Sequence, residues 1–124
     1  MSGKSHKEYS DEVFKLTLER NLVYLTEHLE LQGLFLTRLQ ELKIIDGNQV
    51  DDIKQQGVRY KMATSLLDKM IRKAHLLGPF LLALDQDGQT HIRKKIENYL
   101  PLAEKELQDK KDEEDRLKEK FGIR

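Results

Sequence analysis

The sequence predicts an all-α fold: a bundle of six short antiparallel helices followed by a charged C-terminal helical extension. Apolar residues recur at steps of three and four, as on one face of a helix, and almost nowhere alternate as they do in strands. The chain has 124 residues, 38% of them hydrophobic, which suits one core rather than two. Each apolar stripe has to be buried against the others, so short helices joined by short turns favour a compact bundle.

Leucine-rich stripes predict the first two helices. The first is expected to begin near Ser10 or Asp11, because an apolar stripe starts there and advances by four, four, three and four residues. The second is expected to have Gly33 near its start. The first stripe consists of Phe14, Leu18, Leu22, Leu25 and Leu29, and the second of Leu31, Leu34, Phe35, Leu39 and Leu42.

The third and fourth helices are predicted by a capping pattern and by a wide apolar face. Asp46 is an expected N-cap, and Gln49 three positions later completes the pattern of a capping box. Gly57 is expected to stop this short helix. The fourth helix is expected over residues 58–73 and at the centre of the core, because its apolar face is wide enough to contact several neighbours. That face consists of Ala63, Leu66, Leu67, Met70, Ile71 and Ala74.

Glycine and proline positions delimit the last two helices. The fifth helix is expected to begin close to His75, because Pro79 then falls in the first helical turn. Gly88 can adopt the left-handed conformation that ends a helix, and Thr90 can cap the sixth helix. Pro101 either ends the sixth helix or begins its continuation. The fifth stripe is Leu77, Phe80, Leu81 and Leu84, and the sixth is Ile92, Ile96, Tyr99 and Leu100.

The predicted domain organisation has three parts: a polar N-terminal extension (1–10), the helical bundle (11–102) and a charged segment (103–124). The last segment has 15 charged side chains among 22 residues. We expect a solvated, fraying helix or linker, supported by acid-before-base pairs worth about 0.2–0.5 kcal/mol each. Leu107, Leu117 and Phe121 are too few for a coiled-coil seam. The expected pairs are Glu106–Lys110, Asp112–Arg116 and Glu114–Lys118.

Composition excludes several classes of function. The 22 basic and 22 acidic residues balance, so no overall field draws the chain to nucleic acid or to an anionic membrane. The absence of cysteine excludes a disulfide framework and a thiolate zinc site. No apolar run approaches the roughly 20 residues of a membrane span, and residues 1–10 are too polar for a secretory signal. A cytoplasmic protein is expected.

Catalytic motifs are not found in the sequence. His6, His28, His75 and His91 lack the spacing that places two metal ligands on one helical face. There is no G-x-S-x-G sequence and no glycine-rich phosphate-binding loop. We therefore expect neither an enzyme nor a cofactor nor a metal site.

Five segments carry a resemblance to a known family. They are Thr64–Met70, Phe80–Leu84 and Gly88–Ile92, and upstream Leu18–Leu22 and Leu39–Ile45. Through these segments, residues 11–102 resemble a caspase recruitment domain (CARD), a branch of the death-fold superfamily, whose helices follow a Greek-key topology. One departure is the turn before the fifth helix, where many members have Arg-Gly and this chain has Arg72-Lys73-Ala74-His75.

The resemblance implies a non-enzymatic domain that binds other CARDs, of a caspase, an adaptor or a receptor, in apoptotic or innate-immune signalling. Some similar domains polymerise into filaments. In the commonest family interface a basic surface from helices one and four meets an acidic surface from helices two and three. The basic candidates are Arg20, Arg59, Lys61, Lys69 and Arg72, and the acidic candidates on the opposite side are Glu41, Asp46, Asp51 and Asp52.

Other interpretations of these charges stay open. Charged residues on helix surfaces usually serve only to solvate the protein, and Arg20 is alternatively the partner in an internal salt bridge. A helical nucleic-acid-binding domain and a structural scaffold are the alternative functions. The first would use a basic stripe formed by Lys69, Arg72, Lys73, Arg93, Lys94 and Lys95.

Overall fold

The computed structural model describes residues 9–122, and every regular element in that range is helical. The predicted all-α class is therefore confirmed, although this range contains seven α-helices and one short 3-10 helix instead of six helices. Residues 1–8 of the expected N-terminal extension lie outside the described residues. In chain order the elements are α1 (Asp11–Arg20), α2 (Leu22–His28), α3 (Phe35–Glu41), α4 (Gly47–Lys54), α5 (Arg59–Arg72), η1 (Ala74–Leu76), α6 (Leu77–Gln86) and α7 (Thr90–Phe121).

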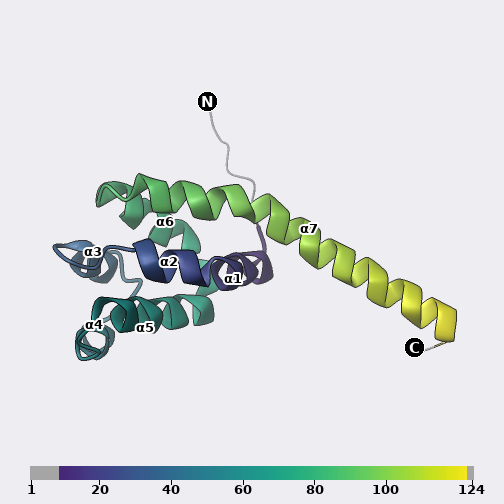
Figure 1. The fold of residues 1–124 in the computed structure, drawn as a ribbon, viewed down its shortest axis with the longest axis horizontal. Coiled ribbons are helices and arrows are strands. Elements are labelled where there is room, and N and C mark those ends of the chain that lie inside the picture. The colour runs from purple at the N-terminus through teal and green to yellow at the C-terminus, as the bar shows by residue number, and fades with distance from the viewer. Residues whose placement is uncertain (1–8, 123–124) are drawn as a thin grey trace.

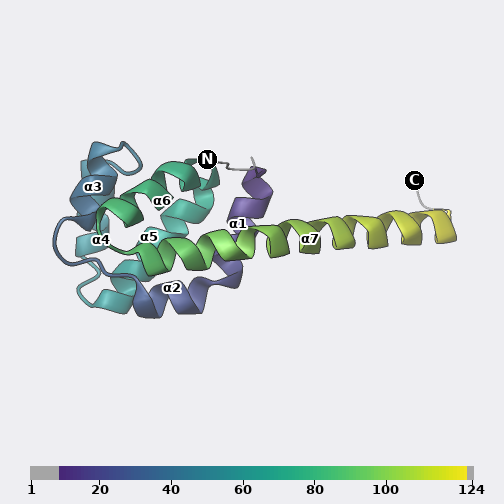
Figure 2. The same ribbon diagram turned by 90° about the horizontal axis from the view of Figure 1, so that it is seen from above.

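The helices form one packed body from which α7 projects (Figure 1). The first part of α7 runs along the body, where it packs against α1 and α6. Its second part continues well beyond the other helices in both views (Figure 2). The long last helix thus belongs partly to the bundle and partly to solvent.

The first predicted helix is two helices in the structure, because the helix breaks at Asn21. The backbone of Asn21 has φ −111° and ψ 15°, and its side-chain Nδ2 donates to the carbonyl of Thr17 at 2.7 Å. Asparagine favours such local bonds to the backbone over a regular helix. The apolar stripe did not indicate the break because Leu18, Leu25 and Leu29 are all buried on either side of it.

The second predicted helix is shorter than expected and ends in an unusual cap. Leu34, expected on its apolar stripe, precedes α3 and is 60% exposed. After the helix, Lys43 has φ 61°, the left-handed conformation usually occupied by glycine. The amide of Lys43 donates to Gln40 O at 3.0 Å and that of Ile44 to Leu39 O at 2.9 Å. This is a Schellman motif with lysine at the strained position.

The capping box predicted at the start of α4 is confirmed. Asp46 Oδ1 accepts from the amide of Gln49 at 2.8 Å, and Gln49 Oε1 accepts from the amide of Asp46 at 3.0 Å. Gly57, with φ 84°, follows the end of α4 as expected. The predicted central helix corresponds to α5, which packs against α1, α2 and α4.

The turn into α6 is close to the prediction, whereas the cap of α7 is not. Pro79 lies in the first turn of α6, and Gly88, with φ 79°, follows its end. The prediction that Thr90 caps the next helix is wrong, because its hydroxyl donates to Asp85 Oδ1 at 3.1 Å. Gln89 occupies the position before α7, and its side chain forms no cap bond.

Gln89 joins two distant turns. Its side-chain Oε1 accepts from the amide of Glu30 at 2.9 Å, while Nε2 donates to the carbonyl of Glu30 at 2.9 Å and to Asp87 Oδ2 at 2.9 Å. Arg38 Nε donates to the other oxygen of Asp87 at 3.2 Å. The buried amide of Gln89 therefore ties the α6–α7 turn to the segment between α2 and α3.

Pro101 neither ends nor begins a helix, because α7 runs through it for 32 residues. Proline removes one hydrogen bond and bends a helix, and α7 changes direction where it leaves the body (Figure 1). Beyond the proline, Ala103 is buried and Leu107 packs against the core. The helix therefore crosses the expected boundary after residue 102 without a break, and the start of the charged segment packs with the body.

The side-chain pairs along the charged segment differ from those expected. Among residues 9–122 none of the three predicted acid-before-base pairs forms. Glu106 pairs with Arg20 of α1 instead of Lys110. The other side chains are exposed, and exposed side chains exchange partners easily. The interactions present are Lys105–Asp109 at 3.3 Å, Gln108–Asp112 at 2.9 Å and Glu113–Arg116.

One hydrophobic core joins the helices. The rings of Phe35 in α3 and Phe80 in α6 lie edge to face, with their centroids 5.9 Å apart. Leu82, one of the apolar residues that carry the CARD resemblance, is 50% exposed, but many of the others are fully buried. The buried ones fill the core and are not available to a partner. Examples are Leu66, Leu67, Phe80, Ala83 and Leu84.

Candidate interaction surfaces

Arg59, at the start of α5, has an internal role that the sequence did not indicate. Its Nη1 donates to the carbonyls of Thr26 at 2.9 Å and Leu29 at 3.1 Å, and its Nη2 donates to the carbonyl of Glu27 at 2.8 Å. The last carbonyls of α2 have no partner within their own helix, and a cation at that end also complements the helix dipole. Arg59 therefore caps α2 from a distant element, which no local sequence pattern reveals.

Lys69 and Asp52 connect the two predicted patches. Lys69 Nζ lies 2.6 Å from Asp52 Oδ2 and 3.2 Å from Ser65 Oγ. The lysine side chain is only 15% exposed, against 57% for the aspartate. The expectation that acidic and basic candidates lie on opposite sides is wrong for this pair, because α4 packs directly against α5.

Arg72 is paired within its own helix. Its Nη2 lies 3.1 Å from Asp68 Oδ2, one turn earlier on α5, and both side chains are exposed. Exposed pairs at this spacing contribute about 0.3–0.5 kcal/mol. Arg72 therefore remains accessible and weakly held.

Three of the nine candidates keep exposed charges without a hydrogen-bond or ion-pair partner among residues 9–122. Glu41 is the last residue of α3, Asp51 lies on α4 and Lys61 lies near the start of α5. Asp46, by contrast, uses its carboxylate in the capping box. The unpaired charges thus lie on three consecutive helices.

Arg20 forms the internal salt bridge that was the alternative interpretation of this residue. Its Nε donates to both carboxylate oxygens of Glu106, at 3.2 and 3.1 Å, and Nη2 also contacts this carboxylate. The hydrogen bonds from Arg20 hold the pKa of Glu106 below its ordinary value, and those to Glu106 raise the pKa of Arg20. The two residues are 86 positions apart, so no local pattern predicts the pair.

Arg93 organises a second charged cluster near the start of α7. Its Nε donates to Asp85 Oδ1 at 2.7 Å, and Nη1 pairs with Glu97. The hydrogen bond from Arg93, with a further one from Thr90, holds the pKa of Asp85 below its ordinary value. This cluster fixes the end of α6 against the first turns of α7.

Most side chains of the basic stripe considered for nucleic acid make contacts with other residues of the same chain. Beyond the pairs of Lys69, Arg72 and Arg93, Lys73 Nζ contacts Ile44 O at 3.3 Å and Gln49 Oε1 at 3.1 Å. Lys95 Nζ lies 4.9 Å from the ring centroid of Tyr24. Phosphate binding would have to displace most of these contacts.

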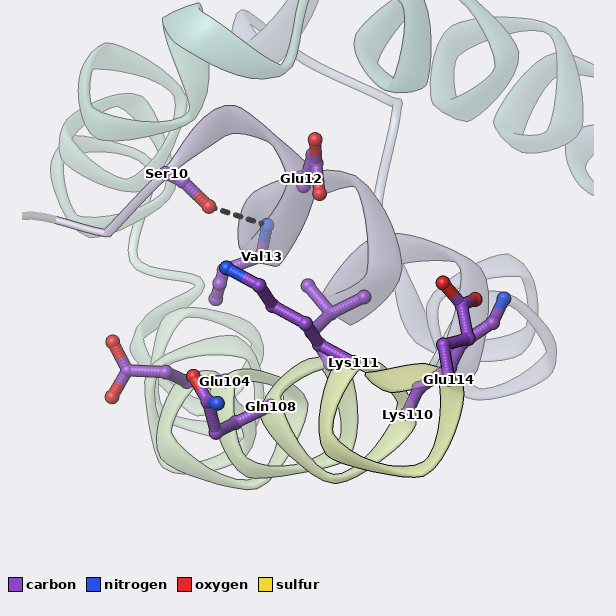
Figure 3. Close-up of a pocket in the computed structure, with 9 residues that line it drawn as sticks. Ser10, Glu12, Val13, Glu104, Gln108, Lys110, Lys111 and Glu114 are labelled. Atoms are coloured by element: carbon purple, nitrogen blue, oxygen red, sulfur yellow. Dashed lines mark hydrogen bonds between the residues drawn. The ribbon is translucent and has the colours of Figure 1, made fainter. Parts of the chain in front are cut away.

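A groove of about 620 Å³ lies between the start of α1 and α7 (Figure 3). Ser10, the N-cap of α1, accepts a hydrogen bond from the amide of Val13 at 3.2 Å on one wall. The charged side chains of α7 that line it are of both signs, so the groove has no single charge to select a ligand. The charged residues of the lining are Glu12, Glu104, Glu114, Lys110 and Lys111.

Within residues 9–122, no group of three or more histidine, aspartate or glutamate side chains is arranged to hold a metal ion. None of the helices in that range combines the length and apolar character needed to cross a membrane. Comparison with known protein families, with characterised proteins and with solved structures finds no match to this chain.

Proposed function

We propose that this chain is a homotypic interaction domain of the CARD type, with the Greek-key topology of the death fold. In this proposal it recruits, or polymerises with, other CARD-containing proteins in cytoplasmic apoptotic or innate-immune signalling, without catalysis or a cofactor. The resemblance in sequence supports the proposal. The structural observation that carries it is the exposed charge of Glu41, Asp51 and Lys61 on α3, α4 and α5, none of which has a partner within residues 9–122.

The physical basis is the presence of acidic and basic side chains on separate exposed surfaces of the same small domain. Two copies that present opposite charges can dock head to tail, and such a contact repeats because the docked pair still has one free basic surface and one free acidic surface. Most of the apolar residues that carry the resemblance are buried, so a partner has to be recognised mainly through side chains outside the core.

Exposed apolar residues beside Lys61 add contact area to the basic candidate. Tyr60 is 57% exposed and Val58 is 49% exposed at the start of α5. Tyrosine is enriched among the residues that dominate binding energy, because it buries a large area at a small entropic cost. Lys61 with Tyr60 is therefore the centre of the basic surface in this proposal.

Single charge reversals test this proposal. We expect Lys61→Glu and Asp51→Lys each to weaken self-association, or capture of a second CARD, by about tenfold or more. Circular dichroism should show an unchanged helical fold, since neither side chain has a partner within residues 9–122. Arg59 and Asp52 are less suitable, because reversing them would also disturb α2 or α5.

Lys94→Glu is the matched control for this experiment. It makes the same change of charge as Lys61→Glu at an exposed position on α7, outside the three helices that carry Glu41, Asp51 and Lys61. The proposal is wrong if no association occurs, or if Lys94→Glu weakens it as much as Lys61→Glu does. Retention on duplex DNA that disappears in moderate salt would favour the nucleic-acid alternative.

A further inference from the structure

Arg20 differs from the other basic candidates in the part of the chain that supplies its partner. Arg59, Lys69 and Arg72 are held by residues of the bundle, within residues 11–102, and Lys61 has no partner among residues 9–122. Arg20 is held by Glu106, which belongs to the charged segment after the bundle. The C-terminal segment therefore reaches into the predicted basic surface at this residue.

The contact between Arg20 and Glu106 has the geometry that a partner would use. The carboxylate faces the planar guanidinium and engages it through both oxygens, which is the preferred arrangement of an arginine–carboxylate pair. A second carboxylate cannot occupy the same donors while Glu106 is bound.

The pair is held in place by helix packing but is open to exchange. Ala103 is buried and Leu107 packs against the core on either side of Glu106, so α7 presents the carboxylate to α1. The side chains of Arg20 and Glu106 are nevertheless 51% and 39% exposed. Such exposed pairs are weak, so an incoming carboxylate can compete for the arginine.

We propose that residues 103–107 of α7 mask Arg20, so that Glu106 competes with an acidic partner surface for this arginine. This inference rests on the proposed function, because it takes the partner to be the acidic surface of a second copy of the chain. Removing the negative charge of Glu106 then frees one more cation for binding, and the extension restrains assembly.

The first test measures the accessibility of Arg20 and does not depend on assembly. Glu106→Gln keeps the length of the side chain and removes its charge. We expect phenylglyoxal to modify Arg20 severalfold faster in this variant than in the wild-type chain, as followed by peptide mass spectrometry. Asp109→Asn is the matched control, because it removes one negative charge from the exposed Lys105–Asp109 pair one turn along α7.

The second test measures self-association of the same variants by sedimentation velocity. Glu106→Gln should tighten the dissociation constant by up to about fivefold, the range expected when an exposed ion pair no longer competes. Asp109→Asn should not. Adding Arg20→Gln to Glu106→Gln should abolish the gain, because the freed cation is then missing.

The outcomes separate this inference from the function on which it rests. The inference is overturned if Arg20 reacts equally fast in the Glu106→Gln and Asp109→Asn variants, or if Glu106→Gln leaves association unchanged or weaker while Lys61→Glu reduces it. If the chain does not self-associate, the competition inferred here fails. If it also fails to capture a second CARD, or if Lys61→Glu affects neither kind of association, the proposed function fails as well.

Discussion

Gln89 shows how much of this fold depends on a few polar side chains that have no helical role. Its amide satisfies both backbone groups of Glu30 and also contacts Asp87, so it connects two turns that are distant in the sequence. A buried side chain with several bonds cannot be replaced without leaving some of its partners unsatisfied.

Gln89→Ala should therefore destabilise the domain. We expect the free energy of unfolding to fall by about 2 kcal/mol, because the two hydrogen bonds to Glu30 are lost. The amide and the carbonyl of Glu30 are then partly buried without a partner from Gln89. Urea unfolding followed by circular dichroism measures this change. Gln86→Ala, at an exposed position on α6, is the control. Equal effects of the two substitutions would contradict the role of Gln89.

Lys43 is the residue at which the backbone is strained. Lys43→Gly should raise the free energy of unfolding by about 0.5–1 kcal/mol, because glycine adopts φ 61° without the clash that a side chain produces. Lys54→Gly, at the last residue of α4, should instead lower it. Thermal unfolding of the two variants compares these effects, and a destabilised Lys43→Gly variant would show that the lysine side chain has another role.

The lowered pKa of Asp85 predicts how the stability of the fold changes at acidic pH. Because Arg93 lowers the pKa of Asp85 in the folded chain, the folded state favours the ionised carboxylate. This stabilisation is present above the unfolded pKa of about 4 and is lost as the pH falls through the lower folded value. Stability should therefore fall below about pH 4, and less steeply in Asp85→Asn. Urea titrations between pH 2 and 7 measure both slopes, and identical slopes would refute this contribution.

Among the helices, the sequence predicted most reliably those defined by an apolar stripe or a cap. The capping box of α4 and the course of α5 needed only residues close together in the chain. The break at Asn21 and the short α3 could not be predicted in this way, because buried leucines lie on both sides of Asn21 and Leu34 is apolar but exposed. The spacing of apolar residues indicates which of them share one face of a helix. It does not show where the backbone departs from helical geometry.

The last helix illustrates the same limit. Pro101 and the change in composition after residue 102 suggested an end, but the contacts of Ala103, Leu107 and Glu106 with distant elements extend α7. Likewise, the basic and acidic candidates follow from their charge and from the helices that the resemblance to a CARD implies, without knowledge of their contacts. The contacts Arg20–Glu106 and Lys69–Asp52 require the tertiary packing of α1 with α7 and of α4 with α5.

Truncations of α7 test how far the packed body extends. A chain ending at residue 108 should unfold at nearly the temperature of the full chain, because residues 109–121 are exposed. A chain ending at residue 102 should be less stable by about 2 kcal/mol, since the burial of Ala103 and Leu107 is lost. Thermal unfolding by circular dichroism compares the three chains. If the shorter chain were as stable as the longer, these contacts would contribute nothing.

For the whole molecule, the resemblance to a CARD bears on the core more than on the surface. Most of the apolar residues that suggest the family are in the core, so binding has to depend mainly on the side chains around it. Most of the candidate charges already have internal partners, which leaves Asp51 and Lys61, with Glu41, as the exposed unpaired candidates among residues 9–122. The proposed function therefore depends on whether these charges meet each other in an assembly.

Mixing two charge-reversed variants tests this claim most directly. Lys61→Glu and Asp51→Lys each keep one original surface charge, so each alone should associate weakly. If Lys61 of one copy meets Asp51 of the next, an equimolar mixture should recover association, because the two reversed side chains attract each other. Sedimentation velocity should then show larger species in the mixture than in either variant alone. A mixture that sediments as the sum of its two components would contradict this pairing.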